Sequence, residues 1–582
     1  MKRIISLLLA SALLLGSLLA FTSCGAPKND GARISVYLGE AVYDFDPTDY
    51  YVDSNAEQVM SLLFDPLFSI NKKGKLKCDA AADDYKVDKD ERTITIELKE
   101  TYWSDGIRVK AEDFVYAWRN VLLNPNNANP AANLLYDIEN AKEIKSAEEG
   151  MSIYEFGAVA SDTYEITITY REGADYKQLL KNLASVATAP IRQDIATELA
   201  SGYWSKIANT AITNGAFAIA SINNIDNSFT LVRNSGYHQK LTVKDHTKIV
   251  RPAMLIGEGG EEISYKDIED KVIFYMSDAP LADRAAHKND AIVVDDLSTY
   301  TYVFNMDKPL FQNENVRKAL SVVIDRNAII EAITFGKAAT GFLPDAVIDT
   351  DTGKSFNKKI DDLISASGNK AAAENLLANV DFSEIGKEIT LTINDDAESN
   401  AIAAIVKTAW ESIGFTVTVD AVKYVENKID PDISSDPIRD SKIQVLVNNA
   451  SRGTRDFDVI AVDWQMYSND PFVALSAFST DFSGCGVKLP AKDTKYSSFG
   501  GYSDSEYDAL IKSAYEEQDK EKRSEILHAA EQKLIDTAPV IPLVFNQSFA
   551  FVNKDISKVK YDGFGNIILI DMKQKNYEDY LD

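Results

Sequence analysis

The chain has 582 residues, a formal net charge of −28 and an apolar content of 45%, which is usual for a globular protein. Such a negative charge repels phosphate groups, so nucleic acid and anionic lipid surfaces are excluded as binding partners. The length is too great for one hydrophobic core, and we expect two or three lobes.

The N-terminus has the pattern of a secretory signal peptide. Two basic residues precede an apolar run that ends at Ser23-Cys24-Gly25. The run is nearly long enough to span a bilayer, so a retained membrane anchor is the alternative. The small residue before the cysteine favours cleavage, and the segment resembles a bacterial lipobox, in which Cys24 becomes the lipid-carrying N-terminus. We therefore expect a signal peptide over residues 1–23, a tether over residues 24–32, and an extracytoplasmic lipoprotein anchored to the outer face of the cell membrane.

Strands and helices are predicted along the whole chain, without an internal repeat or a low-complexity block. Alternation of apolar and polar residues predicts strands, and apolar residues three and four apart predict helices. In chain order, the predicted elements are a strand over 33–40, a helix over 55–63, a strand over 93–98, a helix from 111, a strand over 164–170, two strands within 214–233, a strand and a helix within 300–330, a strand over 389–394, a helix over 401–413, strands over 415–420 and 457–464, and helices after 503 and over about 520–535.

Some of these elements also predict topology. The helix that begins at Ala111 has one apolar face. The strand–helix–strand unit over 389–420 predicts parallel strands joined by a right-handed crossover, with Gly414 ending the helix in a left-handed conformation. A capping box formed by Ser503 and Glu506 predicts the start of a later helix. Parallel and antiparallel units are mixed, so the fold class is α/β with α+β character in several lobes.

The sequence contains no signature of a common catalytic site. The GxSxG, HExxH and Walker A motifs are absent. Pairs of carboxylates do not indicate a catalytic site here, because a chain with 89 acidic residues contains many such pairs by chance. The four histidines are scattered, although a triad assembled from distant residues stays open as an alternative. We therefore expect no enzyme, no cofactor and no metal site. The histidines are His238, His246, His287 and His528.

The three cysteines form no disulfide framework. With Cys24 assigned to lipid, Cys78 and Cys485 remain, far apart in the sequence. They could form one disulfide, but two unpaired buried thiols are the more frequent arrangement.

Aromatic side chains recur beside polar ones at the ends of predicted strands. In open α/β sheets, ligands bind just beyond the carboxyl ends of the strands. Aromatic walls with a few amide and carboxylate groups suit a solute held by stacking and hydrogen bonds. Core packing is the alternative for each aromatic residue taken alone. The predicted ligand-binding residues are Tyr50, Tyr51, Asp463, Trp464, Gln465, Met466, Tyr467, Phe545 and Asn546.

Five motifs in a fixed order resemble one family. WSDG followed by AEDFVYAWR, within Thr101–Pro125, resembles the signature segment of family 5 solute-binding proteins, the oligopeptide and dipeptide receptors of ABC importers. The other four matching motifs are ITNGAFAI (212–219), FNMDKPLFQNENVRKALSVVIDRNAI (304–329), GYSDSEYDALI (501–511) and DTAPVIPLVF (536–545).

The resemblance implies a fold and a mode of action. The fold would be that of periplasmic binding proteins of type II, an α/β architecture with mixed sheets, two main lobes, a hinge and a small inserted lobe. Lobe I would combine 33–62, 197–296 and 546–582, the small lobe would be 63–196, and lobe II would be 297–545. A monomer would enclose its solute by hinge closure and deliver it to an ABC permease and ATPase complex.

The resemblance also raises a question of specificity. In the family, the tryptophan that matches Trp464 lines the cleft, and an aspartate three places later pairs with the ammonium group of the bound peptide. Here that later position is Tyr467. A buried ammonium without a carboxylate would be costly, so either Asp463 or another acid substitutes, or the solute has no free amino group there. We expect a peptide; the alternatives are a non-peptide solute, such as an oligosaccharide, and an exported hydrolase of peptides or glycans.

Overall fold

The computed structural model describes residues 33–39, 42, 44–48, 54–123, 130–146, 148, 150–198, 203–206, 211–223, 228–239, 249–252, 263–359, 362–427, 438–483 and 499–575. The predicted signal peptide and tether, with Cys24, lie outside these residues, as do Tyr50, Tyr51 and Cys485. Within the described ranges, no helix is long and apolar enough to cross a membrane.

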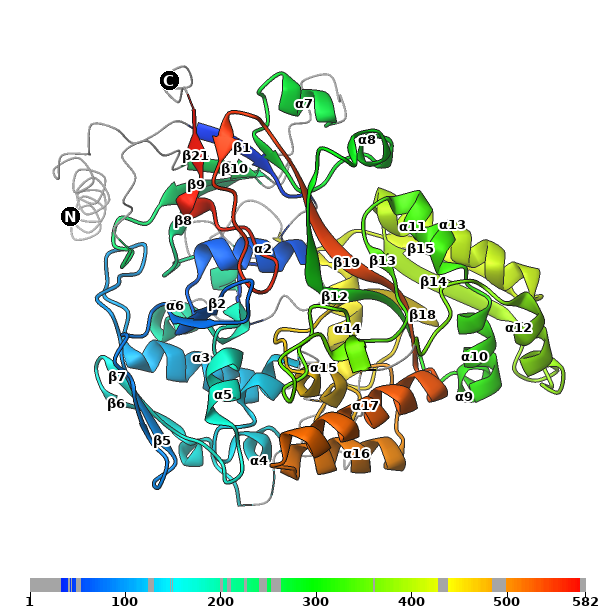
Figure 1. Ribbon diagram of the computed structural model, residues 1–582, viewed down its shortest axis with the longest axis horizontal. Coiled ribbons are helices and arrows are strands. Elements are labelled where there is room, and N and C mark those ends of the chain that lie inside the picture. The colour runs from blue at the N-terminus through cyan, green and yellow to red at the C-terminus, as the bar shows by residue number, and fades with distance from the viewer. Residues whose placement is uncertain are drawn as a thin grey trace, which may run out of the picture.

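One long mixed sheet runs through the molecule (Figure 1). Its strands follow the order β15-β14-β18-β12-β19-β11-β1-β10-β9-β8, and β13 pairs with β19 off this path. We call β11, β1, β10, β9 and β8 the first sheet half, and β15, β14 and β18 the second. The bounds are β1 (Arg33–Tyr37), β8 (Phe217–Asn223), β9 (Ser228–Arg233), β10 (Ile249–Pro252), β11 (Tyr275–Met276), β12 (Ile292–Phe304), β13 (Lys337–Ala338), β14 (Glu388–Asn394), β15 (Thr416–Val422), β18 (Val459–Gln465) and β19 (Val540–Val552).

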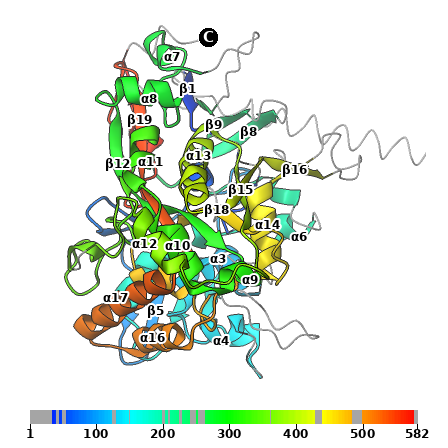
Figure 2. The same cartoon turned by 90° about the vertical axis from the view of Figure 1, so that its right-hand side faces the viewer.

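The strands β12 and β19 stand between the two sheet halves and connect them. Each is 13 residues long, and the two are paired antiparallel along most of their length. The pairing of Ile292–Asp295 is interrupted before it resumes at Thr299–Val303, so the register shifts between Asp295 and Thr299. Figure 2 shows the two strands running from the part of the molecule that carries α7 and α8 down to the part that carries α10 and α12. We call the interruption of the β12–β19 pairing between Asp295 and Thr299 the register break.

A smaller antiparallel sheet, β4-β5-β7-β6, lies in the inserted segment between α2 and β8. The helix α3 packs there through one apolar face that includes Phe114, Val115 and Trp118, as the sequence predicts. The indole nitrogen of Trp118 is satisfied by the carbonyl of Thr188 at 2.8 Å. The bounds are α2 (Ser54–Leu63), β2 (Phe68–Ile70), β3 (Leu76–Cys78), β4 (Lys86–Asp88), β5 (Thr93–Glu97), α3 (Ala111–Leu123), α4 (Ala141–Lys145), β6 (Ala158–Asp162), β7 (Glu165–Thr169), α5 (Tyr176–Asn182) and α6 (Gln193–Glu198).

The second sheet half confirms the predicted parallel crossover. The strands β14 and β15 pair in parallel along seven residues each, and α13 connects them. Gly414 ends α13 with φ +91°, in the left-handed region that glycine adopts without a steric penalty. The helices and strands of this part are α9 (Pro309–Gln312), α10 (Glu314–Val322), α11 (Arg326–Ile333), α12 (Lys370–Leu377), α13 (Ala397–Ser412), β16 (Tyr424–Asn427), β17 (Ile438–Ser441), α14 (Lys442–Ser451), α15 (Pro471–Ser476), α16 (Ser505–Glu516) and α17 (Lys520–Thr537).

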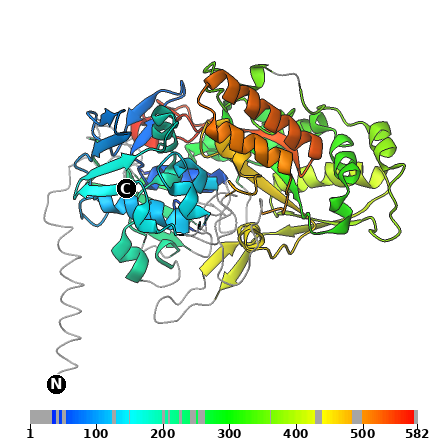
Figure 3. The ribbon, with the colours of Figure 1, turned by 90° about the horizontal axis from the view of Figure 1, so that it is seen from below.

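The remaining short elements accompany the first sheet half, and they are α7 (Tyr265–Glu269), α8 (Leu281–His287), β20 (Ile556–Ser557) and β21 (Lys573–Gln574). Seen from below, the blue and cyan inserted segment lies beside the α16–α17 pair, drawn in orange (Figure 3). Cys78, at the end of β3, is a free and half-buried cysteine. This arrangement is compatible with the predicted lobes, whose limits stay a prediction.

The predicted capping box at Ser503 is wrong by one residue. Asp504 is the N-cap of α16, and its carboxylate accepts hydrogen bonds from the backbone nitrogens of Glu506 at 2.9 Å and Tyr507 at 3.0 Å. Aspartate and serine are equally good capping residues, so the sequence alone does not separate the two positions.

We expect Asp504→Ala to lower the free energy of unfolding by about 1 kcal/mol, because two backbone donors of α16 lose their acceptor. Ser503→Ala is the matched control and should change it by a few tenths of a kcal/mol at most. Thermal unfolding followed by circular dichroism measures both. A larger loss from Ser503→Ala than from Asp504→Ala would contradict this assignment of the cap.

Candidate functional site

The end of β18 lies directly beside the register break. Asp463, Trp464 and Gln465 stand opposite Tyr300, Thr299 and Ser298 of β12. The residues of β19 that flank Asn546 pair with β12 on either side of the interruption. Side chains from β12, β18 and β19 therefore meet where the two sheet halves join. At this place the backbone hydrogen bonds between β12 and β19 are interrupted.

Asp463 and Asn546, both predicted from the sequence, are in contact at this junction. The amide nitrogen of Asn546 donates to Asp463 Oδ1 at 2.6 Å and to Ser298 Oγ at 2.9 Å. The pKa of Asp463 is raised to about 7, mainly by burial and also by the negative charges of Glu398, Asp296 and Asp396, against the lowering effect of the Asn546 hydrogen bond. The carboxyl group is thus held in surroundings that disfavour its charged form.

Three more carboxyl groups lie close to the same junction, and sequence reasoning missed them. Glu57 on α2 accepts a hydrogen bond from Asn566 Nδ2 at 3.2 Å, and the same amide lies 3.3 Å from Asp562 Oδ2. Asp296, within the register break, accepts from the Ser548 hydroxyl at 3.1 Å. With Asp463, these residues (Glu57, Asp296, Asp562) form what we call the acidic cluster.

The charge of Asp296 raises the pKa of each of the other three members of the acidic cluster. Burial is the main cause that raises the pKa of Glu57 to about 8, followed by the charge of Asp296. Burial also raises the pKa of Asp562 to about 6, and Asp296 again contributes. The pKa of Asp296 itself rises to about 6 on burial. Asp296 therefore links Asp463 electrostatically to Glu57 and Asp562.

Within the described residues, no lysine or arginine forms an ion pair with Glu57, Asp296 or Asp562. The buried Arg284 is engaged elsewhere, since its guanidinium pairs with Asp278 at 2.6 Å and with Glu398. Glu57 is buried and Asp296 and Asp562 are half-buried, and carboxyl groups removed from water without a cation favour the entry of one. The arrangement suits the ammonium or basic group of a solute.

Trp464 has a different environment from the one expected of a cleft wall. Its ring stacks against Phe478 and Phe499, with centroid distances of 4.6 and 5.5 Å, and meets Phe342 edge-on. The residue is 5% exposed, and its indole nitrogen has no hydrogen-bond partner in the described part of the chain. In this conformation Trp464 is a core residue.

The other predicted residues after β18 are also buried. Gln465, Met466, Tyr467 and Phe545 are each at most 5% exposed. Tyr467 has φ +53°, a left-handed conformation that is unfavourable for a bulky residue and marks a sharp change of chain direction. Of the predicted residues that the structure describes, Asp463 and Asn546 are therefore brought together at the junction, and the others pack inside.

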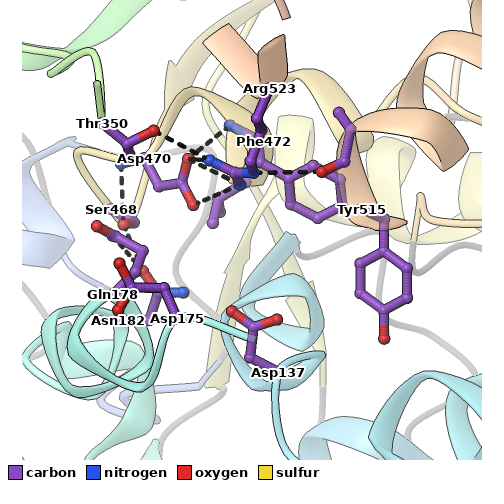
Figure 4. A network of polar contacts seen from close by, with 12 residues as sticks. Asp137, Asp175, Gln178, Asn182, Thr350, Ser468, Asp470, Phe472, Tyr515 and Arg523 are labelled. Carbon is purple, nitrogen blue, oxygen red and sulfur yellow. Dashed lines mark hydrogen bonds and ion pairs between the residues drawn. The ribbon is translucent and has the colours of Figure 1, made fainter. Parts of the chain in front are cut away.

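A network of polar contacts follows the turn at Tyr467 and joins the inserted segment to the helices that come after β18 (Figure 4). Ser468 donates to Asn182 Oδ1 on α5 at 2.7 Å. Asp470 caps α15 through the backbone nitrogen of Phe472 and forms an ion pair with Arg523 of α17 at 3.0 Å. Asp470 is 2% exposed, so this ion pair is buried.

Further contacts widen this connection. Tyr515 of α16 donates to the carbonyl of Tyr136 at 2.9 Å, and the Arg171 guanidinium lies 3.7 Å from the Tyr515 ring centre. Asn133 donates to the Ser476 hydroxyl at 2.6 Å. We call the contacts between residues 133–182 and 468–523 the polar interface. It fixes how the inserted segment sits against the second sheet half.

Comparison with known families identifies the class of protein. A family model described as "Bacterial extracellular solute-binding proteins, family 5 Middle" matches residues 75–484. The dipeptide-binding protein DppE of Bacillus subtilis (strain 168) is 27% identical, over 84% of this chain and 82% of its own. The oligopeptide-binding protein OppA of the same organism is 25% identical, over 88% of each chain. The predicted family is confirmed, and it is a family of binding proteins, which agrees with the expectation that the chain is not an enzyme.

Solved structures confirm the predicted α/β fold. Listeria monocytogenes OppA bound to peptide has a TM-score of 0.76 at 20% identity and matches 94% of this chain and 99% of its own. The unliganded open form of the murein tripeptide-binding protein MppA has a TM-score of 0.54 at 22% identity and the same coverage.

The acidic cluster makes a prediction about stability and pH. Each of its carboxyl groups has a folded pKa above the unfolded value of about 4, so the folded state binds more protons between pH 4 and the folded pKa. Stability therefore decreases as the pH rises through this window. We expect the Tm of the solute-free protein to fall between pH 5.5 and pH 8.5, and Glu57→Gln to reduce that fall.

Asp194→Asn is the matched control for this measurement. A hydrogen bond from Arg192 holds the pKa of Asp194 below its usual value, so this group does not titrate between pH 5.5 and pH 8.5. The substitution should leave the slope of Tm against pH unchanged. An equal effect of Glu57→Gln and Asp194→Asn on that slope would show that the cluster is not its source.

Proposed function

Because the chain belongs to the bacterial extracellular solute-binding proteins, family 5, we propose that it captures peptides outside the cytoplasmic membrane and delivers them to an ABC permease and its ATPase. Cys24 would carry the lipid that holds the protein at the membrane surface, with residues 24–32 as the tether. The net charge of −28 supports an anchor made of lipid rather than of basic residues, because the body of the protein is repelled by anionic headgroups.

The observation that carries the peptide assignment is the acidic cluster at the register break. A free peptide presents one ammonium group, and a buried ammonium needs a carboxylate within hydrogen-bond reach. Tyr467, at the position where the family resemblance implies an aspartate, offers no carboxylate. Asp463 stands four residues earlier, half-buried and next to Asn546. We assign to Asp463 the pairing with the peptide's ammonium group, while Asn546 orients its carboxylate.

Capture would work through the two strands that cross between the sheet halves. The register break in β12 gives the backbone a place where angles can change without breaking a continuous ladder. Rotation about this hinge would bring the inserted segment and the second sheet half together along the polar interface. A solute that contacts both sides favours the closed state by its differential affinity, and the permease then recognises that shape.

Asp463→Asn tests the assignment of the ammonium partner. We expect it to weaken binding of a peptide with a free amino terminus by about 30-fold or more, because a buried charged hydrogen-bonded pair contributes about 2 kcal/mol or more. The wild-type protein should bind the N-acetylated peptide correspondingly weakly, and Asp463→Asn should barely affect that binding. Isothermal titration calorimetry on a hit from a peptide library measures all four affinities.

Asp456→Asn is the control for this experiment, since Asp456 is exposed and lies just before the same strand. It should bind both peptides as the wild type does. If Asp463→Asn lowers the affinity for free and acetylated peptide equally, Asp463 does not recognise the ammonium group. If no peptide raises the Tm but a neutral oligosaccharide does, the solute is not a peptide, while the receptor role stands. Turnover of a chromogenic peptide or glycan would instead favour an exported hydrolase.

A further inference from the structure

A second cluster of titratable side chains lies away from the register break. Asp65 follows α2, Asp79 follows β3, and His238 follows β9. These three segments are distant in the sequence and meet where the first sheet half contacts the inserted segment. We call these three residues the Asp–Asp–His cluster.

The geometry of the Asp–Asp–His cluster is compact and buried. One carboxylate oxygen from each aspartate and one imidazole nitrogen lie within 4.8 Å of one another. His238 Nδ1 is 3.6 Å from Asp65 Oδ2, and His238 Nε2 is 3.3 Å from Asp79 Oδ1. The side chain of His238 is 5% exposed, and those of Asp65 and Asp79 are 10% and 15% exposed.

The polar atoms that face one another in this cluster are not satisfied by hydrogen bonds. Both ring nitrogens of His238 and Oδ2 of Asp65 are buried and have no hydrogen-bond partner within the described residues. Both ring nitrogens lie at ion-pair distance from a carboxylate but without hydrogen-bond geometry, and such an arrangement is costly because buried polar groups are normally hydrogen-bonded. A metal cation would satisfy these atoms, because it accepts lone pairs from nitrogen and oxygen ligands at the same time.

Neighbouring groups hold the two carboxylates in place. The Tyr237 hydroxyl donates to the other oxygen of Asp65 at 3.1 Å, and the Gln239 amide donates to Asp79 Oδ1 at 3.3 Å. The side chain of Asn214 clamps the backbone of Asp65, accepting from its nitrogen at 3.1 Å and donating to its carbonyl at 2.9 Å. Such outer contacts are typical of side chains that orient metal ligands.

We propose that Asp65, Asp79 and His238 bind one zinc ion, which ties α2 and the β2–β3 hairpin to the end of β9. Imidazole nitrogen and carboxylate oxygen are both zinc ligands, and three protein ligands with a water in the fourth position make a tetrahedral site. In such a site neighbouring ligand atoms are about 3.3 Å apart. The distances between the three ligand atoms, now within 4.8 Å, have to shorten by up to about 1.5 Å to reach it.

A protonated His238 between two carboxylates is the competing explanation. Lys99 lies nearby, but its ammonium donates to the carbonyls of Cys78 and Asp79, at 2.9 and 2.7 Å, rather than to either carboxylate of the cluster. Lys99 still acts on both carboxylates through its charge. If the imidazole is neutral, the two carboxylates outweigh this single positive charge, and the negative charge that is left favours a divalent cation. The two explanations differ in one measurable quantity, the amount of zinc bound per chain.

Zinc binding to the full chain tests the proposal. The protein, purified without a polyhistidine tag and treated with a chelator, is titrated with zinc chloride against a chromophoric zinc indicator. We expect one zinc ion per chain and a higher Tm in its presence. His238→Gln and Asp79→Asn should each lower the zinc affinity by at least about 100-fold, because each removes one ligand of three.

His287→Gln is the matched control, because His287 also pairs with an aspartate, at 3.4 Å from Asp290, but is only partly buried. It should bind zinc as the wild type does. Wild-type protein that takes up no zinc, or equal zinc affinity in His238→Gln and the wild type, would overturn the site. Should His238→Gln fail to fold, Asp79→Asn and the zinc content of the wild type decide the question.

Discussion

The pairing of β12 with β19 is the constraint on which the rest of the molecule depends. These two long strands are shared by both sheet halves, so the halves are joined by main-chain hydrogen bonds rather than by side chains alone. Their register shifts twice, between Asp295 and Thr299 and again between Tyr300 and Thr301, and the first shift is the wider interruption. Because backbone donors and acceptors must be satisfied elsewhere at such a place, side chains gather there. The Asp296 carboxylate accepts a hydrogen bond from the backbone nitrogen of Leu297 at 2.7 Å, and the Asn546 amide donates one to the Ser298 hydroxyl.

The acidic cluster gives this junction an electrostatic role. Bringing Glu57, Asp296, Asp463 and Asp562 together in a buried place disfavours their charged forms, as their raised pKa values show. Under the hinge closure that we propose, an empty closed state would be destabilised relative to one that holds a cationic solute. A transport receptor needs a closure that is unfavourable without solute and favourable with solute. Only loaded molecules are then presented to the transporter.

The sequence predicts what is local and misses what is assembled from distant segments. The alternation over β5 and β7, the apolar face of α3 and the left-handed Gly414 are fixed by near neighbours, and all three are confirmed. Trp464 is covered by Phe478 and Phe499 in this structure, and no sequence pattern places those rings beside it. Its contact with solute stays a prediction. Asp65, Asp79 and His238 come from three segments, and neither their spacing nor their residue types predict that they meet.

The position of the carboxylate relative to Tyr467 follows from the backbone itself. Tyr467 adopts a positive φ and is buried to 1% exposure, at a turn that carries the chain from β18 into the polar interface. An aspartate there would face the core rather than the register break. Asp463, by contrast, is still in β18 and in register with Tyr300, so its side chain reaches Asn546 and feels the field of Asp296. A carboxylate that recognises a cation at the junction therefore belongs on the strand, before the turn.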